Sequence, residues 1–313
     1  MPLDTITKAF LDQLAAQPVP KLWQLPPEPG RMAFAAMMSF VGPKDVPIGK
    51  IENVSMPGPG GDIALRIYTP VAAGGEALPA IVFFHGGGFV VGDLDTHDGL
   101  CRLLAAESGA RVIAVHYRRA PEHKFPTAVE DAYAAVCWIE KNATQLGVDA
   151  NRIAVCGDSA GGNLSAVVCQ LAKEKNGPKI AYQLLMFPGT QIGGEFASKN
   201  EFTEGYFLDK AMLDWFHGHY IPPGTDMTDP RHSPLLARDL SGLPPATVML
   251  GGCDPLHDEG LAYAEKLRAA GVPVMVMDYP GMIHCFIYLQ AILPQAHEAL
   301  AKAARNVRHA FEM

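Results

Sequence analysis

A serine set between two glycines is the first feature of the sequence that could carry chemistry. Residues 157–161 read Gly-Asp-Ser-Ala-Gly, and they follow an apolar run at 152–156 and precede a helical pattern. In a sharp strand-to-helix turn the two glycine positions approach each other, and a Cβ at either would clash. The strained serine then projects above a sheet, and the surrounding structure must enforce that strain. We therefore predict that Ser159 is a nucleophile; the alternative is a helix cap.

A serine hydroxyl is a poor nucleophile at neutral pH and needs a neighbouring base. The chain has eleven histidines, of which His284 follows the last predicted strand by a few residues. It should therefore lie at the carboxyl edge of the strands, as Ser159 does, and we predict that His284 is the base. Four other histidines fit less well in position or chain order: His85, His116, His123 and His257.

The base needs an acid to orient it, and two aspartates follow the strand predicted at 246–251. Asp258 would lie in the first turn of a helix, where the helix dipole favours a carboxylate without any catalytic reason. Asp254 comes right after the strand and before a proline. We predict that Asp254 is the acid, because one helix and one strand then separate it from His284 and the two loops emerge side by side.

Attack on an acyl group also requires hydrogen-bond donors for the developing oxyanion. Residues 86–88 are three glycines at the end of a predicted strand, and glycine backbone can approach a ligand closely. We predict that the amides of Gly87, Gly88 and Ala160 form this oxyanion hole, with Gly86 as the fallback. The alternative is a phosphate-binding loop, which is disfavoured because no lysine follows and neither nucleotide fingerprint matches. His85 then braces the loop.

Alternating strand and helix patterns would position these residues. Residues 50–69 hold two alternating runs separated by glycines and prolines, which predict an antiparallel hairpin. Six short apolar runs follow, as expected for strands covered on both faces: 80–84, 111–117, 152–156, 182–187, 246–251 and 272–279. Helical patterns occupy 127–145, 160–175 and 259–270. The sequence thus predicts an α/β fold with a mostly parallel sheet of about eight strands, the first two or three antiparallel, flanked by helices.

Two segments fall outside this alternation. Residues 1–45 precede the sheet and look helical, and residues 188–225 are much longer than an ordinary connection between two strands. Both are rich in large apolar residues: Trp23, Phe34, Met37, Met38 and Phe40 in one, Phe202, Tyr206, Phe207, Trp215 and Phe216 in the other. We expect most of these side chains to pack the segments on each other and on the sheet, and a minority to face a substrate pocket.

Composition excludes several classes of protein. The chain has 313 residues, of which 49% are hydrophobic and 19% charged, too apolar a mixture for disorder. A net charge of -8 gives no reason to bind nucleic acid or an anionic membrane. The first residues do not resemble a signal peptide, and no apolar stretch approaches the roughly 18 residues that span a bilayer. Six scattered cysteines without metal-ligand spacing predict reduced thiols in a cytoplasmic protein.

With these residues in view, the chain resembles the hormone-sensitive lipase family of bacterial and archaeal carboxylesterases, in the branch with a GDSAG elbow. The matching pieces lie within residues 80–290: HGGGFVVGDLDTHD, YRRAPEHKFPTAVEDA, GDSAGGNLSA, LSGLPPATVMLGGCDPLHDEG and MIHCF. The resemblance implies an α/β-hydrolase core at 46–187 and 226–313, with a helical cap formed by 1–45 and 188–225. It also implies that Ser159, Asp254 and His284 form a catalytic triad.

The resemblance implies two further details. The family usually has glycine where this chain has Cys285, so we expect a thiol beside the base that could make the enzyme sensitive to thiol reagents. Cis peptide bonds are implied at Ala120–Pro121 and Phe125–Pro126.

The reaction we expect is hydrolysis of short- to medium-chain carboxylic esters through an acyl-enzyme, with no metal or organic cofactor. A ligand-binding receptor on the same scaffold is the main alternative, and it need not keep all three triad residues. Amidase or thioesterase activity differs only in the leaving group and stays open. We further expect a small-molecule ester as the partner, with no nucleic acid and no membrane insertion, and an exposed edge strand that could support a homodimer.

Overall fold

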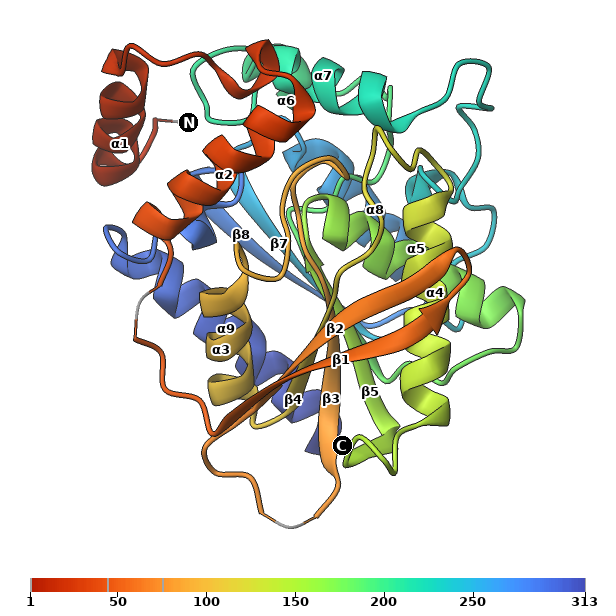
Figure 1. Ribbon diagram of the computed structural model, residues 1–313. Coiled ribbons are helices and arrows are strands. Elements are labelled where there is room, and N and C mark those ends of the chain that lie inside the picture. Colours follow the sequence, from red (N-terminus) through yellow and green to blue (C-terminus); the bar gives the residue numbers. More distant parts are fainter. Residues whose placement is uncertain (1, 44, 75, 313) are drawn as a thin grey trace.

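The apolar runs of the sequence form one twisted sheet (Figure 1). We describe it in a computed structural model of the chain, which covers residues 2–43, 45–74 and 76–312. Within those residues the sheet has eight strands: β1 (Lys50–Gly58), β2 (Gly61–Thr69), β3 (Leu78–Phe84), β4 (Arg111–Val115), β5 (Val148–Asp158), β6 (Tyr182–Met186), β7 (Ala246–Cys253) and β8 (Val274–Ile283).

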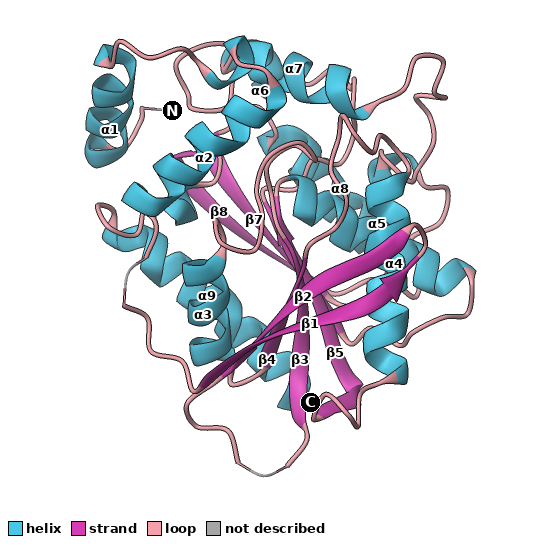
Figure 2. Ribbon diagram, in the orientation of Figure 1, coloured by secondary structure: helices cyan, strands magenta, loops and turns pink. Residues whose placement is uncertain are grey.

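The strand order is β1-β2-β4-β3-β5-β6-β7-β8 (Figure 2). The first two pairings, β1 with β2 and β2 with β4, are antiparallel, and all later ones are parallel. The predicted mostly parallel sheet with an antiparallel start is therefore confirmed. Because the carboxyl ends of the parallel strands meet at one edge, residues that follow different strands can gather there.

The last strand is longer than the sequence pattern indicates. The pairing of β7 with β8 shifts register after Gly251 and resumes where Cys253 lies opposite Ile283. This irregularity lets β8 continue to Ile283 instead of ending near Tyr279. His284 therefore follows the strand directly, at the carboxyl edge.

Helices cover both faces of the sheet (Figure 1). One face carries α3 (Asp98–Ser108) and α9 (Pro294–Glu312), and the other carries α4 (Thr127–Lys141), α5 (Ala160–Glu174) and α8 (His257–Ala269). The helical patterns identified in the sequence correspond to α4, α5 and α8, and they did not include α3 and α9. Among the described residues, no helix is both long and apolar enough to cross a membrane.

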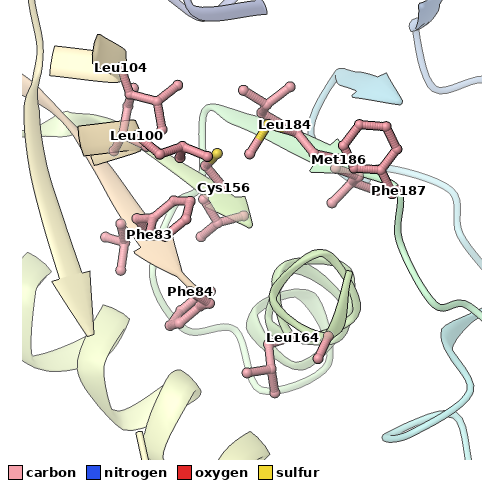
Figure 3. Close-up of a cluster of buried hydrophobic side chains, with 14 of the residues drawn as sticks. Phe83, Phe84, Leu100, Leu104, Cys156, Leu164, Leu184, Met186 and Phe187 are labelled. Atoms are coloured by element: carbon pink, nitrogen blue, oxygen red, sulfur yellow. The ribbon is translucent and has the colours of Figure 1, made fainter. Parts of the chain in front are cut away.

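The core lies in two layers, one on each side of the sheet. Figure 3 shows Phe83 and Cys156 directed toward Leu100 of α3, whereas Phe84 is directed toward Leu164 of α5. All five side chains are buried. Neighbouring residues on a strand point to opposite faces, so a continuous apolar run fills both layers, as the sequence pattern predicts.

Four helices lie together above the carboxyl edge of the sheet (Figure 1): α1 (Thr5–Ala16), α2 (Pro27–Val41), α6 (Ala197–Glu201) and α7 (Lys210–Tyr220). They come from the two segments that fall outside the alternation of strands and helices. Two of these helices begin at an aspartate cap: in α1 the Asp4 carboxylate accepts hydrogen bonds from the amides of Ile6 and Thr7, and in α7 that of Asp209 accepts one from the Met212 amide.

The two segments pack against each other through aromatic side chains. The rings of Phe10 and Phe207 lie 6.4 Å apart. The Trp215 ring lies so near Gly30 of α2 that a Cβ there would be 3.6 Å from it. These contacts join residues far apart in the sequence into one layer over the sheet.

Candidate active site

The Gly-Asp-Ser-Ala-Gly stretch forms the expected turn between β5 and α5. Ser159 has a φ of 54° and a ψ of -115°, a conformation that L-residues rarely adopt. A Cβ on Gly157 would come 2.6 Å from the Phe84 carbonyl oxygen, and one on Gly161 would overlap that oxygen. Glycine is thus required on both sides, because β3 lies directly against the turn and a Cβ on Gly157 would also overlap the Gly161 carbonyl. The Ser159 amide donates to the carbonyl of Met186 at 2.7 Å, which holds the strained residue in place.

The structure brings the three predicted side chains together. His284 Nε2 lies 2.9 Å from Ser159 Oγ, and His284 Nδ1 lies 2.7 Å from Asp254 Oδ2. The other carboxylate oxygen of Asp254 accepts a hydrogen bond from the Leu256 amide at 2.8 Å. Asp254 is 1% exposed and His284 4%, so water competes little for these hydrogen bonds.

The residues that fitted less well as the acid or the base make other contacts. Asp258 accepts from the amide of Ser198 at 2.9 Å and lies beside His257, so it does not orient His284. His85 is buried, stacks on the Tyr117 ring at 4.2 Å and contacts the Gly86 carbonyl through Nδ1 at 2.8 Å. Burial lowers the pKa of His85 well below its usual range, and the neutral ring stacks beneath the glycine loop.

The glycine loop lies beside the serine. Gly87 and Gly88 have φ values of 110° and 58°, which favour glycine. Both line one cavity with Ser159 and Ala160, the first residue of α5, whose amide has no partner within the helix. The fallback donor, Gly86, does not line the cavity in the described part of the chain. Its amide donates to Asp158 Oδ1 at 3.1 Å and is already engaged.

A cavity of about 580 Å³ opens above these residues. Its floor includes Ser159 and His284, and its walls come from α1, α2, α7 and the connecting loops. Five of the ten large apolar residues singled out in the sequence line it: Trp23, Phe34, Met37, Phe207 and Phe216. We expected only a minority of these ten side chains to face the cavity, and the structure places half of them there.

One part of the cavity wall is polar. Lys199 Nζ lies 2.5 Å from Glu259 Oε2, and the other carboxylate oxygen accepts from the amides of Thr190 and Gln191. Burial raises the pKa of Glu259, and the Lys199 cation acts against that shift. His217 lies on α7 in the same wall, and burial lowers its pKa to about 4.

Comparison with known proteins identifies the family to which the chain belongs. A family model described as the alpha/beta hydrolase fold matches residues 81–288. The carboxylic ester hydrolase LipN of Mycobacterium tuberculosis is 48% identical over 245 residues, which are 76% of this chain and 65% of LipN. Carboxylesterase NlhH of the same organism is 41% identical over 254 residues, 80% of this chain and 79% of NlhH. The chain belongs to the hormone-sensitive lipase family of carboxylesterases.

Solved structures of esterases have the same fold over nearly the whole chain. The ester-hydrolase EH1AB1 from the metagenome of Lake Arreo, complexed with a derivative of bipyridine phosphonate, superposes with a TM-score of 0.97 at 43% identity and covers 99% of this chain and 100% of its own. The hyperthermophilic esterase of the archaeon Pyrobaculum calidifontis gives 0.93 at 41% identity, with 99% of both chains covered.

One buried carboxylate of this esterase was not predicted from the sequence. Asp158, next to Ser159, is fully buried and engages the amide of Gly86 and the hydroxyl of Tyr288, while His97 Nε2 lies 3.5 Å away. It thus ties the serine turn to the glycine loop and to the loop after His284. Its place inside the Gly-Asp-Ser-Ala-Gly stretch was the only available signal, because its partners are distant in sequence.

The structure also locates the two details implied by the family resemblance. Cys285 is buried, with a φ of 54° in the region where glycine is favoured. Burial raises the pKa of its thiol well above the usual value, so the reactive thiolate is scarce and we expect slow alkylation. The bonds Ala120–Pro121 and Phe125–Pro126 are both cis.

Proposed function

We propose that this carboxylesterase acts through an acyl-enzyme formed on Ser159. His284 Nε2 accepts the hydroxyl proton while Ser159 Oγ attacks the ester carbonyl carbon. The amides of Gly87, Gly88 and Ala160 donate to the resulting oxyanion. His284 then gives its proton to the leaving alkoxide, the ester C–O bond breaks and the alcohol departs.

The second half of the reaction reverses the proton path. Water attacks the acyl carbon, His284 accepts its proton and returns a proton to Ser159 Oγ, and the carboxylic acid leaves. Asp254 accepts a hydrogen bond from His284 Nδ1–H throughout, which fixes the tautomer and stabilises the imidazolium. The observation that carries the proposal is the chain of contacts at 2.9 Å and 2.7 Å from Ser159 through His284 to Asp254.

We infer that the substrates have short to medium acyl chains. The cavity of about 580 Å³ has a mostly apolar wall and leads directly to Ser159, which supports an apolar ester of limited length. Residues 1–45 and 188–225 act in this proposal as a cap over the core formed by 46–187 and 226–313. The cap sets the shape of the cavity, and the core supplies the reacting groups.

Two further properties belong to the proposal. The chain works in the cytoplasm, which is supported by cysteines that form no disulfide bond among the described residues, as suits a reducing compartment. It forms a homodimer through the edge of β8 at residues 274–279, where Met275 is half-exposed; further along the strand, the Gly281 carbonyl already accepts a hydrogen bond from the Asp4 amide at 3.0 Å. Light scattering of the purified chain tests the dimer.

The test of the mechanism is Ser159→Ala with p-nitrophenyl butyrate as substrate. We expect turnover to fall by roughly 10⁴- to 10⁶-fold, because the nucleophile and its pairing with His284 are lost together. The melting temperature should stay close to that of the wild type, which would show that the fold is kept. Hydrolysis at the wild-type rate in this variant would exclude the acyl-enzyme on Ser159.

A further inference from the structure

Helix α7 rests directly on the glycine loop, residues 85–92. The Phe216 ring lies so close to Gly88 that a Cβ at position 88 would overlap it. One helical turn further along α7, the Tyr220 ring is stacked on Phe89, with centroids 3.8 Å apart and planes 7° from parallel. Two side chains of one helix therefore cover two consecutive residues of the loop that holds the oxyanion donors.

One of the two covered residues, Phe89, has an unfavourable backbone conformation. Phe89 has a φ of 63°, which is uncommon for a residue with a side chain, and it follows two glycines that also have positive φ. Such conformations persist only where the surroundings enforce them. Two backbone hydrogen bonds stabilise this part of the loop. The Val91 amide donates to the Gly87 carbonyl at 2.9 Å, and the Ala120 amide donates to the Phe89 carbonyl at 2.9 Å. The Phe89 side chain is held by the Tyr220 ring.

Tyr220 is itself held in place by contacts with Phe125. Its carbonyl accepts a hydrogen bond from the Phe125 amide at 2.9 Å, and its ring meets the Phe125 ring edge to face at 5.9 Å. The side chain is fully buried, and its hydroxyl has no hydrogen-bond partner among the described residues. The ring, and not the hydroxyl, is therefore the part of Tyr220 that makes specific contacts.

We propose that Tyr220 is a positioning residue for ester hydrolysis: its ring, stacked on Phe89, keeps the glycine loop in the conformation that points the Gly87 and Gly88 amides at the oxyanion. The inference rests on the proposed acyl-enzyme mechanism and assigns α7 a role beyond shaping the cavity. Tyr220 does not line the cavity, in contrast to Phe216 and Phe89. Its loss should therefore act on the transition state rather than on binding of the ester.

The experiment compares Tyr220→Leu, which removes the stacked ring, with Tyr220→Phe, which keeps it. Phe202→Leu is the matched control, because Phe202 is a buried aromatic residue of the same 188–225 segment that contacts Tyr206 and not the glycine loop. For each variant, kcat and KM are measured with p-nitrophenyl acetate, butyrate and octanoate. The inhibition constant of an alkyl trifluoromethyl ketone, which forms an oxyanion on the serine, is measured alongside.

For Tyr220→Leu we expect kcat to fall about 10- to 100-fold, somewhat less than the loss of a complete oxyanion donor. KM should stay within about threefold of the wild type, since the Tyr220 side chain is not itself part of the cavity wall. The fold-loss should be the same for all three esters, and the ketone should bind more weakly by a similar factor. Tyr220→Phe and Phe202→Leu should retain wild-type kcat and ketone affinity.

Three results would overturn the inference: wild-type kcat in Tyr220→Leu, a loss confined to KM, or a loss that depends on acyl length. If Tyr220→Leu fails to fold, Tyr220→Met is measured in its place, because it keeps most of the buried volume without an aromatic face. The acyl-enzyme mechanism and the role of Tyr220 can be excluded independently of each other. Full activity of Ser159→Ala would exclude the acyl-enzyme, whereas full activity of Tyr220→Leu with an inactive Ser159→Ala would exclude only the role of Tyr220.

Discussion

The floor and the roof of the cavity are built in different ways. The floor consists of residues at the carboxyl ends of β5, β7 and β8, each held by buried hydrogen bonds to its neighbours. The roof consists of α1, α2, α6 and α7, which come from two distant segments and meet mainly through aromatic and apolar contacts. The floor thus holds the reacting atoms at hydrogen-bonding distance from one another, whereas the roof encloses a volume. Catalytic rate and substrate preference should therefore respond to separate substitutions.

The largest effect should come from the floor. Asp254→Asn keeps the size of the side chain but offers His284 Nδ1 the wrong hydrogen-bonding partner. By analogy with other serine triads, kcat should fall by roughly 10³- to 10⁴-fold. The order of preference among p-nitrophenyl esters of different chain length should not change. A chain-length preference that shifts together with kcat would show that floor and roof are not separable.

Much of the floor could be predicted from the sequence, because local pattern and chain order determine it. The glycines around Ser159 specify the turn, and Asp254 and His284 follow consecutive apolar runs, separated by one helix, that are expected to be neighbouring strands in the sheet. The register shift that carries β8 to His284 was not visible, since it depends on pairing between two strands. The contacts of Asp158 could not be predicted for a similar reason: its partners Gly86 and Tyr288 come near it only in the folded chain.

The roof was predictable only as two helical, apolar segments. Nothing in the sequence of α7 indicates that Tyr220 stacks on Phe89 and not on some other ring, because the contact joins residues 89 and 220 across the fold. Likewise, Met37 and Met38 are adjacent and chemically identical, yet only Met37 lines the cavity. The rotation of a helix about its own axis in the packed structure decides which side faces a cavity, and composition does not encode that rotation.

A second prediction concerns the stability of the roof. His217 of α7 has a pKa lowered to about 4, chiefly by burial, with Lys199 adding to the shift. The unfolded chain therefore binds more protons than the folded one between about pH 4 and pH 6.5. The contribution of neutral His217 is complete above pH 6.5 and is lost as the pH falls through this window.

We expect the free energy of unfolding of the wild type to drop, between pH 7 and pH 4, by up to about 3 kcal/mol more than that of His217→Gln. Urea denaturation at a series of pH values measures the difference. His309→Gln, at an exposed position of α9, serves as the control. Identical pH slopes for wild type and His217→Gln would mean that His217 titrates equally in both states.

The smallest effect should be a change of preference without a loss of rate. Met37→Ala enlarges the cavity from α2, whereas Met32→Ala on the same helix changes a side chain that is 68% exposed and outside the cavity. We expect kcat/KM for the octanoate ester relative to the acetate to rise about 3- to 10-fold in Met37→Ala, as expected for roughly one additional buried methylene group at about 0.8 kcal/mol. Met32→Ala should match the wild type. If the two variants gave the same ratio of kcat/KM values, the roof would have no part in substrate selection.

The most direct test of the account is to identify the residue that becomes covalently modified during catalysis. The purified chain is incubated with a p-nitrophenyl alkylphosphonate, digested, and its peptides are examined by mass spectrometry. We expect one phosphonyl group per chain, attached to Ser159, release of one equivalent of p-nitrophenol, and no adduct in His284→Ala within the same time. A stoichiometric adduct on any other residue, or complete inhibition with Ser159 unmodified, would contradict this expectation.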